Sequence, residues 1–247
     1  MKKYGWIPSF PDHRDLIFKA QLTQFPLKTD LRAQCPPVYD QGNLGSCTAN
    51  AIGAAIEFEH LKQFNKDLMP SRLFIYYNER TIEGTVNSDS GAMIRDGIKS
   101  VNKFGVCPET EWPYIISKFK KKPPVKCYQD ALKDKVVSYF SIQNLNDMKL
   151  CLASGFPFVF GFSVYESFES QTVAKTGVVP MPSKNESFLG GHAVMAVGYD
   201  DSKQVFIVRN SWGEGWGDKG YFYMPYAYLT NPKLAADFWE ITLITNS

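Results

Sequence analysis

The stretch Gln41-Gly42-Asn43-Leu44-Gly45-Ser46-Cys47 leads into the first long helix expected in this chain, residues 46–64. Ser46 suits a helix N-cap, and apolar residues on most faces of 46–64 predict a buried helix. The two glycines allow a tight turn and leave room for a substrate beside the sulfur. A helix start stabilises a thiolate and presents unpaired N–H groups to an oxyanion. We therefore infer that Cys47 is reactive, although a lone cysteine at a helix start is more commonly structural.

A reactive thiol needs a base, and the chain has only three histidines. His60 lies on the same expected helix as Cys47, about 20 Å away along the axis, which is too far for a hydrogen bond. His13 lies in a proline-rich segment that does not resemble a rigid platform. His192 follows two glycines and begins an apolar strand. Elimination leaves His192 as the base for Cys47.

A third polar group usually orients the imidazole of a Cys–His pair. Asn210 stands at the end of the apolar run 205–208. A hairpin that pairs this run with the strand of His192 would bring Asn210 beside the imidazole. Trp212 and Trp216 follow closely, and their rings could shield a His–Asn hydrogen bond from water.

Four sequence blocks, in this order, resemble the papain/cathepsin family of cysteine proteases over roughly residues 28–247. They are Gln41 with Gly45-Ser46-Cys47, Gly191-His192-Ala193-Val194, Val197-Gly198-Tyr199, and Asn210-Ser211-Trp212-Gly213-Glu214-Gly215-Trp216-Gly217. The resemblance implies an α+β, papain-like fold of two lobes. A helical lobe with a central helix would face a lobe with an antiparallel β-barrel-like sheet, and the active-site cleft would lie between them.

The same resemblance implies a role for each matching residue. Cys47 is the nucleophile, paired with His192 as thiolate and imidazolium, and Asn210 orients His192. The Gln41 side chain and the Cys47 backbone N–H form the oxyanion hole. The implied substrate-binding residues are Ser90, Gly91, Met93, Ala193 and Trp212.

Each substrate-binding residue has an implied place. Ser90-Gly91 forms the edge at which Gly91 hydrogen-bonds an extended substrate. Met93 and Ala193 fall near the pocket for the side chain two residues before the scissile bond, and Trp212 lies on the leaving-group side.

Departures from the family pattern indicate a divergent bacterial or viral member with a short N-terminal extension. Leu44 stands where the family usually has a disulfide-forming cysteine, and Thr48 where it usually has Trp or Tyr. The family's long helical propeptide has no counterpart in this sequence. None of these differences removes a catalytic group.

Composition along the chain predicts three parts: an N-terminal extension at 1–27, a helical lobe at 28–131 and a β-rich lobe at 132–247. The basic, proline-containing loop 118–124 precedes the change from helix-like to strand-like sequence and is expected to be solvated. Beyond 46–64, helices are expected near 72–80, 92–104 and 146–154. Strands are expected at 158–164, 192–199, 205–210, 220–224 and 240–245.

The segment 1–27, called the arm below, contains prolines and aromatic residues and is expected to be extended. It resembles the extended, partly apolar peptide that the cleft should prefer. We expect it to lie near or across the cleft and to restrain activity as a short pro-segment. A permanent structural strap is the alternative.

The 247 residues carry a formal net charge of +2, so nucleic acid or an anionic membrane is not expected as a partner. No run of 18 apolar residues occurs, so no membrane-spanning helix is expected. No Cys/His spacing fits a metal site, so no metal or cofactor is expected. Cys107 and Cys127 could form a disulfide, which the sequence leaves open. The start shows no secretory signal, which favours a cytoplasmic protein or non-classical export, with secreted or virion-associated as the alternative.

The expected function is a monomeric cysteine endopeptidase that cleaves a peptide or protein substrate through an acyl-enzyme. The same Cys-His-Asn triad could instead serve an acyl transferase or a deamidase. A catalytically silent peptide-binding module is the alternative from another class.

Overall fold

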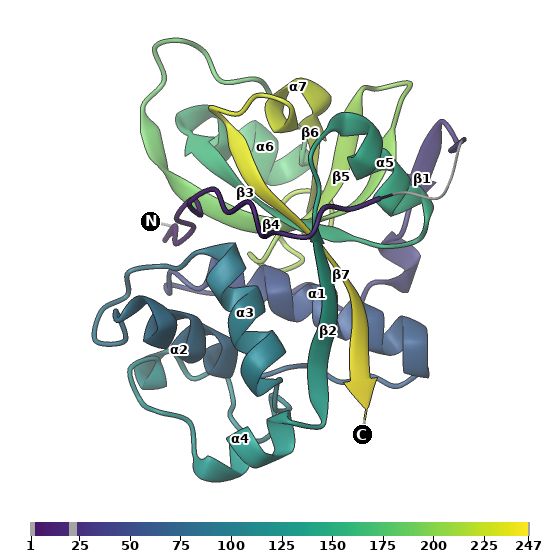
Figure 1. The fold of residues 1–247 in the computed structure, drawn as a ribbon. Helices are drawn as coiled ribbons and strands as arrows, with labels where there is room; N and C mark the ends of the chain where they lie inside the picture. The colour runs from purple at the N-terminus through teal and green to yellow at the C-terminus, as the bar shows by residue number, and fades with distance from the viewer. Residues whose placement is uncertain (1–2, 20–23, 247) are drawn as a thin grey trace.

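The computed structural model describes residues 3–19 and 24–246, which form a helical half and a β-rich half (Figure 1). The helical half contains α1 (Cys47–Phe64), α2 (Arg72–Glu83), α3 (Ile94–Phe104) and α4 (Val125–Ala131). Every residue of α1 from Cys47 to His60 is buried, because α2 and α3 cover one side and the sheet covers the other. The apolar pattern on all faces of this helix follows from that position.

The β-rich half is built on one antiparallel sheet of seven strands. The strands are β1 (Lys28–Asp30), β2 (Asp134–Ser141), β3 (Phe158–Tyr165), β4 (Phe188–Asp200), β5 (Val205–Arg209), β6 (Tyr221–Pro225) and β7 (Ala235–Asn246). They follow the order β2-β7-β3-β4-β5-β6, and β1 adds to β4. Three short helices lie outside the sheet: α5 (Leu145–Ala153), α6 (Gln171–Thr176) and α7 (Tyr226–Leu229).

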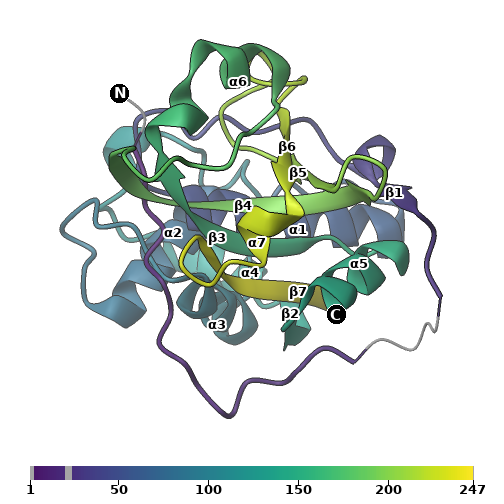
Figure 2. The same cartoon turned by 90° about the horizontal axis from the view of Figure 1, so that it is seen from above.

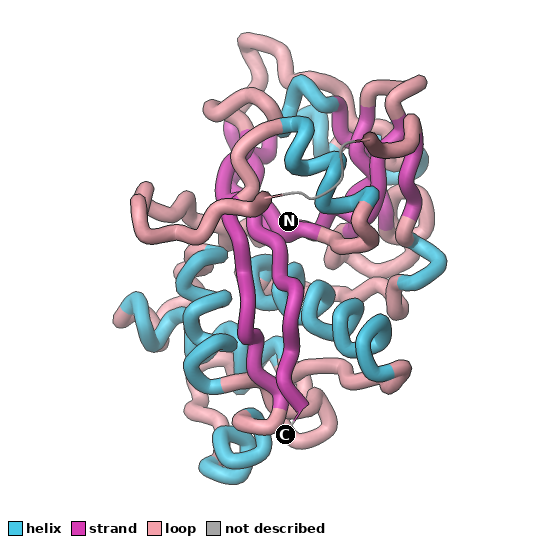
Figure 3. Tube along the Cα trace, turned by 45° about the vertical axis from the view of Figure 1, so that its right-hand side comes forward, coloured by secondary structure: helices cyan, strands magenta, loops and turns pink. Residues whose placement is uncertain are grey.

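The expected α+β fold with a helical half and an antiparallel sheet is confirmed, and the sheet is open rather than closed into a barrel. Among the described strands, β2 and β6 lie at opposite edges and do not pair. The long β2–β7 ladder runs away from the other strands toward the helices, where β2 contacts α3 and β7 contacts α1 (Figure 3). Because these strands leave the sheet in this direction, β2 cannot fold back to β6.

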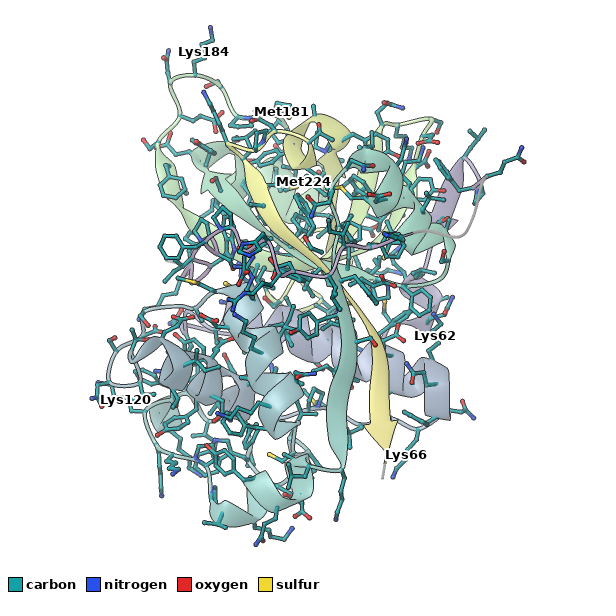
Figure 4. All side chains as sticks on the ribbon, in the orientation of Figure 1. Lys62, Lys66, Lys120, Met181, Lys184 and Met224 are labelled. Atoms are coloured by element: carbon teal, nitrogen blue, oxygen red, sulfur yellow. The ribbon has the colours of Figure 1, made fainter. Side chains whose placement is uncertain are left out.

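The expected helices and the five expected strands all occur, with boundaries shifted by a few residues. Five further elements were not expected from the sequence: β1, β2, α4, α6 and α7. Since β1 pairs with β4, the chain from residue 28 first joins the β-rich half rather than the helical lobe. The basic loop precedes α4, and Lys120 in this loop projects outward from the helical half (Figure 4). None of the described helices combines the length and apolar character needed to cross a membrane.

The described residues of the arm, 3–19 and 24–27, form an extended segment that runs along the outside of the molecule (Figure 2). Near its start, Ala92 N donates to Gly5 O at 2.7 Å and Ile7 N donates to Ala92 O at 3.0 Å. On the other side, Trp6 N donates to the carbonyl of Gly191 in β4 at 2.9 Å. Further along, Ile17 bridges to Ser141 at the end of β2. Residues 5–7 therefore lie between the helical half and the β-rich half.

Candidate active site

Cys47 is the first residue of α1, and the turn before it is held by side chains other than the expected cap. Ser46 occupies the N-cap position, but its hydroxyl accepts from Asn50 Nδ2 at 3.0 Å instead of capping a backbone N–H. The Asp89 carboxylate accepts from Gly45 N at 3.0 Å and from the Tyr76 hydroxyl at 2.6 Å. The glycine turn is thereby fixed, and the Ser46 side chain leaves the first N–H groups of α1 available at the sulfur.

The Cys47 side chain is fully buried. Burial raises the pKa of its thiol to about 12, while backbone N–H groups of Ala193, Gly5 and Thr48 act in the opposite direction. The Ala193 N–H places Cys47 beside the residue that follows His192 in β4. With the arm seated, burial outweighs the stabilising N–H groups and keeps the thiol neutral.

His192 and Asn210 meet through the pairing of β4 with β5. His192 Nε2 lies 2.8 Å from Asn210 Oδ1, and Ser211 N also donates to that oxygen at 2.8 Å. The Ser211 contact identifies this atom as the amide oxygen, so Nε2 must carry the hydrogen. Nδ1 is then the ring nitrogen left for proton transfer.

Aromatic rings enclose this histidine. Trp212 stacks on His192 with ring centroids 5.0 Å apart and an angle of 28°, and Phe162 approaches edge-on at 5.7 Å. Trp216 packs in turn against Trp212. The Asn210 side chain is almost fully buried beneath these rings. The expected shielding of the His–Asn hydrogen bond from water is therefore consistent with this packing.

Gln41 is oriented by Ser211. The Ser211 hydroxyl donates to Gln41 Oε1 at 2.6 Å, which turns the amide nitrogen toward the arm. Gln41 Nε2 donates to Leu44 O at 2.9 Å and to Lys3 O at 3.3 Å. A peptide carbonyl of the arm thus lies at the donor that would bind an oxyanion.

The arm approaches the site so closely that glycine is required both in the arm, at Gly5, and in the helical half, at Gly91. A Cβ on Gly5 would lie 1.8 Å from Gly45 O, and a Cβ on Gly91 would lie 2.1 Å from Gly5 O. Lys3 Nζ pairs with Asp89 at 2.8 Å, and the Tyr4 hydroxyl donates to Glu169. These contacts fasten the arm over Cys47.

Trp6 inserts its side chain into a pocket of the β-rich half. A Cβ on Gly161 would lie 1.9 Å from the indole, so only glycine admits the ring here. Trp6 Nε1 donates to Asp237 Oδ2 at 2.9 Å, and Ser9 N donates to the same oxygen at 2.8 Å. Asp237 has a left-handed φ of 59°, a conformation that Asp tolerates better than most residues.

The residues expected to bind substrate differ in whether they contact the arm, the Cys47 site or neither. Ala92, rather than Gly91, offers both its N–H and its carbonyl to the arm, because the Gly91 N–H donates to the Tyr76 hydroxyl at 3.2 Å. Ser90 Oγ instead bonds Thr85 Oγ1 at 2.9 Å. Met93 lines a surface hollow together with residues 9–12 of the arm. The Ala193 backbone lies beside Cys47, and Trp212 stacks on His192.

Sequence reasoning missed four contributors to this site: Asp89, Ala92, Ser211 and Asp237. Ser211 could have been found, since it follows Asn210 within a recognised block. Asp89 and Ala92 flank the expected Ser90-Gly91 edge. Asp237 lies in a segment without any motif, and only the sheet brings it to Trp6.

The two departures from the family pattern near Cys47 are accommodated by local packing. Leu44 is buried in the core, where its side chain replaces a cysteine. Thr48 donates its hydroxyl to Glu79 Oε1 at 2.6 Å inside the helical half. Burial raises the pKa of Glu79 well above its usual range, and the charge of Glu79 is one of the causes that raise the pKa of Cys47.

The sequence spacing predicted no metal site, yet one group of potential ligands comes together in the described part of the chain. Ligand atoms of Cys107, Glu111 and Cys127 all lie within 4.8 Å of one another. None of them belongs to the Cys47 site, and each of the two cysteines is a free thiol.

Comparisons with known proteins show similarity in sequence and in fold. A family model described as papain family cysteine protease matches residues 25–235. An uncharacterized peptidase C1-like protein of Acanthamoeba polyphaga mimivirus is 46% identical, over 99% of this chain and 88% of the viral protein. Cysteine proteinase 1 of Entamoeba histolytica is 30% identical over 81% of this chain and 64% of that protein.

A solved structure is similar over almost the whole chain. Xylellain, a cysteine protease from Xylella fastidiosa, superimposes with a TM-score of 0.92 at 48% identity, covering 97% of this chain and 96% of xylellain. Digestive procathepsin L 3 of Tenebrio molitor, at 18% identity and a TM-score of 0.73, shares the fold. The viral and bacterial similarities confirm the resemblance inferred from the four sequence blocks.

Proposed function

The chain belongs to the papain family of cysteine proteases and is a thiol peptidase; on this premise we propose that Cys47, His192 and Asn210 cleave peptide bonds through an acyl-enzyme. One observation carries the proposal: the Gln41 amide donates to a peptide carbonyl of a segment whose Gly5 N–H faces the Cys47 sulfur. A peptide backbone therefore fits between the nucleophile and the oxyanion donor. Such a fit is the geometric requirement for attack on a carbonyl.

In the proposed reaction, the Cys47 thiolate attacks the carbonyl carbon while His192 holds the proton on Nδ1. Gln41 Nε2 and the Cys47 backbone N–H stabilise the oxyanion. His192 then protonates the leaving amine and later activates a water that releases the acyl group. Asn210 keeps the Nε2–H in place, so Nδ1 faces the sulfur throughout.

We assign the arm the role of an intramolecular inhibitor. It fastens to the helical half through Lys3 and Asp89 and to the β-rich half through Trp6 and Asp237. Its Gly5 N–H contacts the Cys47 thiol, which has no exposed surface while the arm is seated, so a substrate must displace the arm to reach the sulfur. Trp6 in the arm forms a parallel β-bridge with Ala92. A permanent strap would have the same contacts but would be needed for folding.

Two variants test the chemistry in a chain that lacks residues 1–25. Cys47→Ala should abolish turnover, and Gln41→Ala should lower kcat by about 10²–10³-fold, the cost of one oxyanion donor. Full peptidase activity in Cys47→Ala would contradict the proposal. Mass spectrometry of the products distinguishes hydrolysis from acyl transfer, in which an added amine is joined, and from deamidation, in which a Gln side chain changes.

Deleting residues 1–25 also separates inhibitor from strap. Higher peptidase activity with unchanged circular dichroism supports inhibition. An unfolded product supports the strap. A chain that folds but neither cleaves peptides nor reacts with a thiol-directed inhibitor would favour a silent binding module.

A further inference from the structure

A cluster of potential metal ligands lies in the helical half, outside the peptidase site. Cys107 follows α3, Glu111 ends a turn, and Cys127 lies in the first turn of α4. One ligand atom from each lies within 4.8 Å of the other two. Cys107 and Cys127 are almost fully buried, whereas the Glu111 side chain is 25% exposed and opens toward solvent. We propose that Cys107, Cys127 and Glu111 bind a zinc ion.

The backbone around these residues is already positioned for such a site. Ser71 N donates to Cys107 O at 2.8 Å, and Glu111 N donates to Pro108 O at 3.0 Å. Cys127 N donates to Pro124 O at 3.0 Å, which fixes the start of α4. Cys107 and Glu111 therefore lie in one hydrogen-bonded turn, and Cys127 joins them from α4. Tetrahedral zinc with bonds of about 2.0–2.3 Å separates neighbouring sulfur and oxygen ligands by about 3.5–3.8 Å, so closure shortens any of these separations by at most about 1.3 Å.

The Glu111 carboxylate distinguishes a metal site from a simple pair of thiols. Its Oε1 accepts from Lys126 Nζ at 3.0 Å, but among the described residues no donor reaches Oε2, which is buried. A disulfide between Cys107 and Cys127 would provide no donor for this oxygen either. A cation would satisfy it, because zinc binds thiolate sulfur and carboxylate oxygen together.

The charges also balance in the zinc form. Two thiolates and one carboxylate around Zn²⁺ leave one net negative charge, and the Lys126 ammonium lies against Glu111 to offset it. Each thiol loses its proton to solvent on binding, and no electron transfer is involved. The metal would fasten α4 and the basic loop before it to the segment after α3. The fourth position would be open to water on the side of Glu111.

Zinc binding is measured on the full chain under a metal-free reductant, in a Cys47→Ala background that removes the peptidase thiol from the assay. We expect one zinc per chain by elemental analysis after dialysis, and thiolate-to-metal charge-transfer absorption when Co²⁺ is used instead. Cys107→Ser and Cys127→Ser should each weaken binding at least about 100-fold, and Glu111→Gln about 10-fold. Cys35→Ser is the matched control and should bind as the parent does.

Thermal unfolding provides a second readout. Zinc should raise the Tm of the parent and of Cys35→Ser but not of Cys107→Ser. If the cysteine variants fail to fold, the Co²⁺ spectrum of Glu111→Gln still decides, since loss of an oxygen ligand shifts the metal bands. Absence of bound zinc in the parent, equal weakening by Cys35→Ser, or a Cys107–Cys127 disulfide that forms in air with zinc present would overturn the proposal.

Discussion

Trp6 and Asp237 lie at opposite ends of the chain, yet the indole Nε1 of Trp6 donates to Asp237 Oδ2 at 2.9 Å. This contact joins the arm to the β-rich half at the place where the arm crosses the active site. Hydrogen bonds to a charged group contribute about 1.5–3 kcal/mol. The contact therefore helps to hold the arm in place. It also affects which side chains can enter the pocket that Trp6 occupies.

Trp6→Phe in the full chain removes this hydrogen bond together with the five-membered ring of the indole, while one aromatic ring stays in the pocket. Leaving Asp237 without its indole partner should shift the arm toward release by roughly tenfold or more. We expect basal peptidase activity to rise correspondingly, measured as kcat/KM on a fluorogenic peptide. Phe10→Ala, which alters an exposed arm residue, is the control. Unchanged activity in Trp6→Phe together with activation by arm deletion would show that the arm is held elsewhere.

Gly5→Ala should prevent the arm from seating at all. The added Cβ would lie 1.8 Å from the carbonyl oxygen of Gly45, a backbone atom in a fixed turn. We expect this full-length variant to approach the activity of the chain lacking residues 1–25, with the same thermal stability in the remainder of the fold. A variant as inactive as the parent would mean that the arm can lie over Cys47 in another way.

The reactivity of Cys47 should depend on the arm. Burial raises the pKa of this thiol to about 12 while the arm is seated, so little thiolate exists near neutral pH. Releasing the arm through Gly5→Ala exposes the sulfur and lowers its pKa. Alkylation by iodoacetamide, located by mass spectrometry across a pH series, should be at least about tenfold faster in that variant near pH 7. Cys107, Cys127 and Cys151 serve as internal controls whose rates should not change.

Asp237 should also select substrates once the arm is removed. A substrate side chain with an N–H, such as Trp or Arg, can replace the indole of Trp6, whereas Phe would leave the carboxylate unpaired. We expect kcat/KM for matched peptides to favour Trp over Phe by about tenfold at the position that enters this pocket. Asp237→Ala should remove that preference. If the ratio is the same in Asp237→Ala, another residue sets the specificity.

Stability should fall as pH rises through neutrality, because of carboxyls buried between the two halves. Burial raises the pKa of Glu59 in α1 and of Glu240 in β7 to about 7, and the charge of Glu59 raises that of Glu240 further. In the unfolded chain a glutamate titrates near about 4.3. The folded chain therefore binds more protons between these values, and its stability is lost as pH rises through about 7.

Glu240→Gln tests this dependence. The amide cannot ionise, so the free energy of unfolding from denaturant titrations should vary less between about pH 5 and about pH 8 than in the parent. Glu214→Gln changes an exposed carboxyl and should leave the pH dependence as it is. A steep decline retained in Glu240→Gln would locate the responsible groups elsewhere.

Much of the fold and the candidate site could be anticipated from the chain alone. The apolar residues on most faces of 46–64 predicted a buried helix, because a helix packed on several sides buries more than one face. Cys47 was singled out by its helix start and His192 by exclusion of the other histidines. Asn210 followed from strand pairing. These inferences rest on local chemistry and spacing, which a sequence displays directly.

What lies over the site was decided by the tertiary structure. Whether the arm seats on Cys47 depends on Gly5, Gly91 and Gly161 leaving space from three separate segments. The partner of Trp6 lies at the other end of the chain, and sheet pairing alone brings it there. Contacts between distant segments also account for three other features. These are the open sheet, the use of Ala92 rather than Gly91, and the proximity of Cys107 and Cys127. Local sequence determines which groups can react; long-range packing determines which of them meet, because contacts between distant segments exist only after the halves assemble.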